Sequence, residues 1–189
     1  IDSIKISVET ILKENSNLSI LHCTSIYPAP PETMRLGAIQ HLKETFPDLE
    51  VGLSDHSLGI AVSLGAVAVG ANIIEKHFTK SREWPGPDNP FSIEPHELKN
   101  LVDWSKEIWK ARGGEKDILD DEKPVIDFAY ACVVAIKNIN KGEVLSLDNI
   151  WVKRPGTGEI FAKDFENVLG KIATVNISEN TQLAESMFK

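Results

Sequence analysis

The feature that most constrains this sequence is the alternation of short apolar strands with helices over residues 1–112. After a first helical pattern at 4–13, three strand patterns are each followed by a helical pattern; the strands lie at 19–25, 49–54 and 71–78, and the helices at 33–46, 60–69 and 94–112. Repeated βα units predict a parallel sheet, because each helix returns the chain to the starting end of the next strand.

The length of these units favours one barrel architecture. They repeat every ~23–30 residues, near the ~31 residues per unit of a complete (β/α)8 barrel. The alternative is a small open doubly wound domain, but a sheet of three strands leaves two open edges. We therefore expect residues 1–112 to form the last part of a (β/α)8 TIM barrel.

The pattern changes after Arg112. Residues 113–126 are polar and acidic and are typical of a linker. Residues 127–189 contain short β-rich runs separated by turns, with expected strands at 128–135, 144–146, 149–154 and 172–177. This part of the chain predicts a small, irregular β domain of ~60 residues.

Composition excludes some functions. The chain has 20 Lys and Arg against 28 Asp and Glu, a net charge of −8, which argues against non-specific nucleic-acid binding. No apolar run reaches the ~18 residues that a membrane span needs. The two cysteines form no CxxC or metal-ligand spacing, so we expect a reduced, cytoplasmic protein.

Polar residues gather where the expected strands end. Ser54 and His56 share one side of their strand, and Glu75 and His77 share one side of the next, because strand side chains alternate. Two imidazoles side by side at a barrel mouth suit a divalent metal. A single histidine at a strand end is more often structural, so spacing alone leaves both interpretations open. Asp55 and Lys76 have the opposite parity and are expected to form a salt bridge or support the site from behind.

Two loops offer further groups. The sequence around Asp88 (PGPD) is either a plain turn or a stiff loop that holds a carboxylate over the barrel mouth. Arg154 ends a strand of the β domain. It is either an exposed cation or a planar donor for a carboxylate or phosphate.

Seven motifs in order resemble the bacterial N-acetylneuraminate synthase family. They are LHCTSIYP at 21–28, GLSDH at 52–56, IEKHFT at 74–79, PGPD at 85–88, DFA at 127–129, INKGE at 139–143 and VKRPG at 152–156. The resemblance implies a phosphoenolpyruvate-binding TIM barrel followed by a β-clip domain called antifreeze-like or SAF. It implies condensation of phosphoenolpyruvate with N-acetylmannosamine and water to N-acetylneuraminate and phosphate.

The resemblance also implies residue roles. His56 and His77 match the metal-binding histidines of the family, usually with Mn²⁺ as the cofactor. Ser25 and Ser54 match positions at the phosphoenolpyruvate site; Ser25 stands where some relatives have Asn. The amino-sugar site is matched by Tyr27, Asp88 and Phe128.

Arg154 matches the arginine that the SAF domain sends into a partner's barrel, which implies a domain-swapped homodimer. Other family residues lie on earlier barrel strands that this sequence does not contain, so we expect the chain alone to be inactive. Asn89 follows PGPD where many relatives have His. The alternatives are a legionaminate or pseudaminate synthase of the same family, or a non-catalytic SAF-containing binding module.

Overall fold

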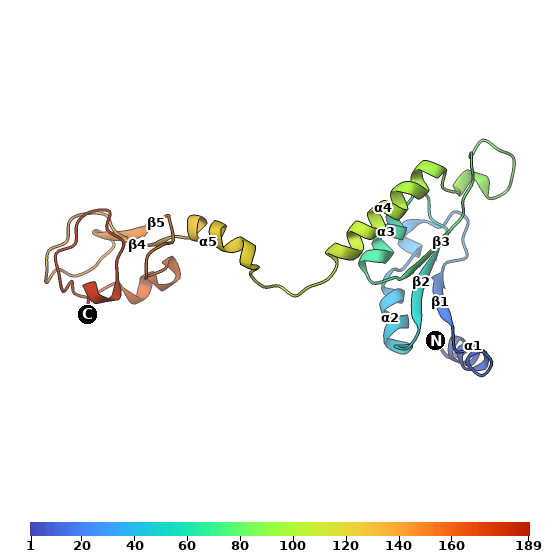
Figure 1. Cartoon of the computed structure of the whole chain (residues 1–189), viewed down its shortest axis with the longest axis horizontal. Coiled ribbons are helices and arrows are strands. Elements are labelled where there is room, and N and C mark those ends of the chain that lie inside the picture. Colours follow the sequence, from blue (N-terminus) through green and yellow to red (C-terminus); the bar gives the residue numbers. More distant parts are fainter. The chain divides into compact units, whose positions relative to one another are not determined.

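A computed structural model describes residues 1–189 and divides them into two compact units, Ile1–Gly114 and Glu115–Lys189 (Figure 1). Each unit has its own cluster of buried apolar side chains. None of the helices combines the length and the apolar composition that crossing a membrane requires.

The first unit is built on a parallel sheet of three strands, as the sequence predicts. The strands are β1 (Ser19–Cys23), β2 (Glu50–Asp55) and β3 (Ile73–Lys76), in that spatial order. Ser54 is level with both Cys23 and Glu75, and Asp55 is level with Lys76. The carboxyl ends of β2 and β3 therefore lie at the same height at one edge of the sheet.

Four helices accompany the sheet. They are α1 (Asp2–Leu12), α2 (Gly37–Thr45), α3 (Ala61–Ala68) and α4 (Pro95–Ala111) (Figure 1). The core lies where β2 packs against α2 and α3, and includes Val51, Leu53, Ile39 and Ala66. Because Val51 and Leu53 face these helices, the alternating residues of β2 face the other side of the sheet.

Local chemistry sets two helix starts. The expected helix over 33–46 begins only at Gly37, because Arg35 has a φ of 45°, which a right-handed helix excludes. A short 3-10 turn, Pro31–Thr33, precedes it. The start of α4 follows the sequence: Pro95 takes the first turn, and Glu94 and Glu97 form a capping box.

The second unit contains a helix that the sequence interpretation missed. We expected an irregular linker to 126 and a strand from 128, but the chain forms a 3-10 turn at Asp120–Glu122 and then α5 (Lys123–Ala129). Pro124 lies in the first turn of α5, and the acidic residues before it suit the positive end of a helix dipole. The prediction of a strand at Phe128 was therefore wrong.

Strands follow α5. β4 (Cys132–Ala135) pairs antiparallel with β5 (Ile150–Lys153), so that Val133 is level with Val152. The other expected strands make only isolated bridges, such as Val144 to Ile172. The buried side chains of this unit come from segments spread along the whole domain: Val133, Ala135, Ile139, Leu145, Ile150, Ile160, Val168, Ala173, Ile177 and Leu183.

Candidate functional site

Two histidines lie together at the carboxyl ends of β2 and β3. Their rings are 5.3 Å apart between centroids, with an angle of 61° between planes. His56 is buried, whereas the side chain of His77 is 30% exposed. The structure thus brings together the pair that strand parity predicted.

The hydrogen bonding of His56 leaves the lone pair of one ring nitrogen available. Nδ1 of His56 lies 2.8 Å from the carbonyl oxygen of Thr24. A carbonyl only accepts, so Nδ1 carries the proton in this bond and Nε2 keeps a free lone pair. Nδ1 of His77 lies 3.6 Å from a carboxylate oxygen of Asp88, which favours the same tautomer. Both rings are thereby suited to offer Nε2 to a divalent metal.

Aromatic side chains surround the two imidazoles. The ring of Tyr27 lies 4.2 Å from that of His56 and 6.0 Å from that of His77, between centroids. The ring of Phe91 lies 5.1 Å from that of His77. Tyr27 was identified from the sequence but Phe91 was not, since an apolar residue after a loop has no distinctive spacing.

A hydroxyl and a carboxylate lie two residues before the histidines, on the same face of the sheet. Ser54 is buried, and its Oγ donates to Oε1 of Glu75 at 2.7 Å. The parity of Glu75 with His77 was visible in the sequence, but we did not include Glu75 among the site residues. Ser25 is exposed, and its Oγ lies 3.9 Å from Sγ of Cys23.

A buried ion pair lies on the helix side of the sheet, directly behind the histidines. Nζ of Lys76 is 3.0 Å from Oδ2 of Asp55, and both side chains are almost fully buried. The predicted salt bridge is confirmed. Burial alone would raise the pKa of Asp55, but hydrogen bonds from Ser63 and Ser57 and the charge of Lys76 hold it below its ordinary value. Burial lowers the pKa of Lys76, and Asp55 only partly offsets this.

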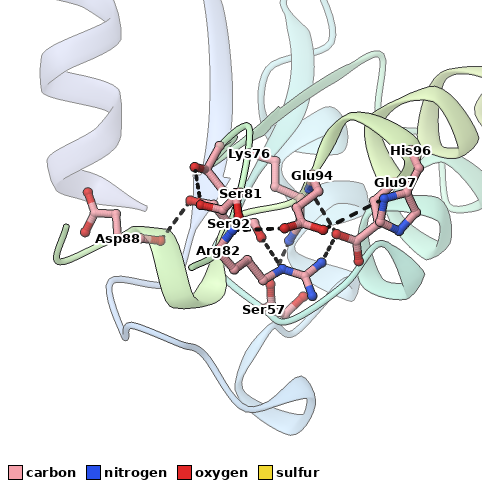
Figure 2. Close-up of polar contacts among 10 residues, drawn as sticks. Ser57, Lys76, Ser81, Arg82, Asp88, Ser92, Glu94, His96 and Glu97 are labelled. Atoms are coloured by element: carbon pink, nitrogen blue, oxygen red, sulfur yellow. Dashed lines mark hydrogen bonds and ion pairs between the residues drawn. The ribbon is translucent and has the colours of Figure 1, made fainter. Parts of the chain in front are cut away.

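The loop that carries Asp88 is held by its own hydrogen bonds (Figure 2). Ser92 Oγ donates to the carbonyl of Asp88 at 2.8 Å, and Arg82 Nε donates to the carbonyl of Ser92 at 3.0 Å. Arg82 also pairs with Glu97 at the start of α4. These contacts hold the loop, and a carboxylate oxygen of Asp88 lies 3.6 Å from Nδ1 of His77.

A second cluster of potential metal ligands lies elsewhere. Glu94, His96 and Glu97 have ligand atoms within 4.8 Å of one another (Figure 2). The two carboxylates already cap α4, and each also accepts a hydrogen bond from Arg82. These contacts explain the cluster without an ion.

The second unit carries the other two predicted site residues. Phe128 is 70% exposed on α5, and Arg154 is exposed just after β5. The backbone N–H of Gly156 donates to the carbonyl of Asp127 at 2.9 Å. A Cβ at Gly156 would lie only 2.7 Å from Cβ of Tyr130. The end of α5 and the turn after Arg154 are thus joined within this unit.

Imidazole, hydroxyl and carboxylate groups lie together at the strand ends of this parallel sheet. This arrangement is typical of the catalytic end of a barrel enzyme. The first unit is part of such a (β/α)8 barrel, and a SAF domain follows it. The chain belongs to the NeuB family, whose profile matches residues 1–117; the SAF domain profile matches residues 130–189.

Several of the similar proteins are synthases of related sugar acids. The chain is 46% identical to N,N'-diacetyllegionaminic acid synthase of Campylobacter jejuni, over 91% of the chain and 51% of that protein. It is 40% identical to pseudaminic acid synthase of the same species, over 94% and 51%. A crystal structure of the sialic acid synthetase of Leptospira borgpetersenii, in complex with citrate, is 41% identical, with a TM-score of 0.57 over 64% of this chain and 42% of that one.

The chain spans about half the length of the curated relatives it matches. The part of the NeuB barrel described above is therefore only a portion of the barrel that these relatives contain.

Proposed function

We propose that this protein acts, as part of a complete NeuB-family barrel, as a synthase that joins phosphoenolpyruvate to an N-acylated amino sugar. The observation that carries the proposal is the pair His56 and His77, whose rings lie 5.3 Å apart at the strand ends with Nε2 of both suited to bind a metal. The similarity to synthases of three related sugar acids supports the same reaction class.

A divalent metal, which we propose to be Mn²⁺, fits these residues. When bound, it supplies a Lewis acid for the carbonyl oxygen of the open-chain sugar. Thr24 fixes the tautomer of His56, the carboxylate of Asp88 lies 3.6 Å from Nδ1 of His77, and Tyr27 packs against the ring of His56. Nitrogen ligands without a thiolate also accommodate Co, Fe and Zn.

The other site residues divide between the two substrates. We assign Ser25 and Ser54 to phosphoenolpyruvate, because the family resemblance implies that role. Ser25 follows β1, and Ser54 lies near the end of β2, one residue before Asp55. Tyr27, Asp88 and Phe128 are assigned to the amino sugar. Arg154 offers planar donors to an anionic substrate.

The reaction forms one C–C bond and one C–O bond from water, and it breaks the C–O bond to phosphate. Of the two protons of water, one balances the proton gained by the sugar oxygen and the other leaves with phosphate. The methylene carbon of phosphoenolpyruvate attacks the aldehyde carbon of the sugar, whose oxygen takes up a proton. Water adds at C2 of the phosphoenolpyruvate unit, and inorganic phosphate leaves from that carbon.

The sugar defines the particular synthase. N-acetylmannosamine is the first candidate. A sugar with two acetamido groups is the second, and the 46% identity to a diacetyllegionaminic acid synthase favours testing it. Comparing kcat/KM for the two sugars with the intact protein decides between them.

The central test removes one histidine. His56→Ala should lower Mn²⁺ affinity at least ~10-fold and abolish turnover that Mn²⁺ restores in the chelated wild type. His41→Ala is the control, because His41 is exposed on α2. Unchanged turnover in His56→Ala would rule out the metal role. An intact wild-type protein that turns over neither sugar would instead favour a binding module.

A further inference from the structure

The buried pair Asp55 and Lys76 joins two strands at a particular level. Asp55 and Lys76 form the last rung of the β2–β3 ladder. The next residue on each strand is a histidine of the proposed metal site. Beyond that rung the backbones diverge: the carbonyl of His56 accepts from Ala29, and the carbonyl of His77 accepts from Ile93.

The contacts of the pair hold the residues on both sides of His56 in the sequence. Nζ of Lys76 donates to the carbonyl of Ser57 at 2.7 Å (Figure 2), and Oδ1 of Asp55 accepts from the backbone N–H of Ser57 at 2.8 Å. Oδ2 of Asp55 also accepts from Ser63 on α3. The residues before and after His56 are therefore both fixed to β3 or α3.

The side chains of the pair and the histidine rings lie on opposite faces of the sheet. Side chains alternate along a strand, so Asp55 and Lys76 face the helices while His56 and His77 face the opposite side. Any effect of the pair on a metal must pass through the backbone positions of the two histidines.

We infer that Asp55 and Lys76 are positioning residues that set the separation of His56 and His77, and hence the metal affinity of the site. This inference rests on the proposed function. Stability alone does not explain the pair, because replacing a buried ion pair with neutral residues of similar size is often neutral or stabilising.

The test is the double variant Asp55→Asn/Lys76→Met in the intact protein. These residues keep the approximate volumes, and Asn retains an oxygen for the Ser57 N–H. We expect the variant to fold, judged by its circular dichroism and thermal unfolding, and to bind Mn²⁺ ~10-fold or more weakly in an electron paramagnetic resonance titration. The control is Lys99→Met, which breaks the exposed pair of Lys99 with Asp103 on α4 and should leave Mn²⁺ affinity unchanged.

A second measurement does not require the metal. Metal-free crystal structures of the wild type and the double variant give the separation of the two rings directly. A folded double variant with wild-type Mn²⁺ affinity overturns the inference. If the wild type itself binds no Mn²⁺, the proposed function fails. The inference then depends on the ring separation in the metal-free structures. It is overturned if the two rings are as far apart in the double variant as in the wild type.

Discussion

At the scale of single residues, the carboxylate of Asp55 shows how one buried charge is stabilised. Its side chain has no exposed surface, and it accepts hydrogen bonds from Ser57 and Ser63 in addition to the ion pair with Lys76. A buried charge is tolerated only when such partners replace water. Removing a single partner of such a pair typically costs about 3–5 kcal/mol.

The lowered pKa of Asp55 predicts that the free energy of unfolding falls at acid pH. Its contribution is complete above the unfolded-state value of ~3.9, and it is lost as the pH falls through the lower folded-state pKa. Denaturant unfolding between pH 6 and 2 should show a smaller loss of the free energy of unfolding in Asp55→Asn than in the wild type. Equal losses in the two proteins would contradict this role.

The site residues differ in how visible they were in the sequence. His56 and His77 could be paired because strand parity is strict. The contacts of Tyr27 and Phe91 with the imidazole rings could not be predicted, because both residues lie in segments without periodicity. The substrate roles of Ser25, Ser54, Asp88, Phe128 and Arg154 rest on the family resemblance and stay predictions.

At the scale of elements, the segments that follow α5 and β5 meet where Gly156 lies against Tyr130. An added methyl group at this position would lie 2.7 Å from Cβ of Tyr130 and 3.0 Å from its backbone. The end of α5, which carries Phe128, and the turn after β5, which carries Arg154, therefore depend on a residue without a side chain.

Gly156→Ala should destabilise the second unit by roughly 1–3 kcal/mol, since tight packing leaves no space for a methyl group. Chemical denaturation followed by tryptophan fluorescence, to which Trp151 contributes from the second unit, measures this. Gly113→Ala is the control, because its methyl group would meet no atom within 4 Å. A variant as stable as the wild type would show that α5 moves away from the turn without cost.

At the scale of the whole molecule, the sheet of the first unit has two unpaired edges, one on β1 and one on β3. A closed barrel has none. The helix α1 buries only Val8 and leaves Ile6 and Ile11 exposed. Both features suit a part of a barrel that packs against further βα units.

Residues 1–189 expressed alone should therefore show no synthase turnover. The missing strand ends would hold the remaining substrate ligands, and open edges favour association. The measurement is a sensitive assay for the sugar acid, with light scattering to detect association. Product formed by the purified chain would show that all essential residues lie within it.

Arg154 allows a test of whether two subunits share a site. Residues 113–119 separate α4 from the 3-10 turn that precedes α5, and they span roughly 25 Å if extended. The family resemblance implies that the SAF domain serves a neighbour's barrel. If the arginine acts on a neighbour, mixing inactive Arg154→Ala and His77→Ala proteins should restore part of the activity, because a hybrid dimer contains one intact site.

The control for this mixture is subunit exchange, followed with two affinity tags. Exchange without recovered activity would show that Arg154 acts within its own chain or has no role in turnover.

The sequence by itself determined the parallel βα order, the change to a β-rich domain, and the facing of His56 and His77, because periodicity and parity are local properties of the backbone. It missed α5, whose seven residues are too few for a periodic pattern. Only the tertiary structure decided that the ion pair of Asp55 and Lys76 is buried, that Asp88 lies beside His77, and that Gly156 packs on Tyr130. Those contacts join segments far apart in the chain, and their geometry depends on how the elements pack.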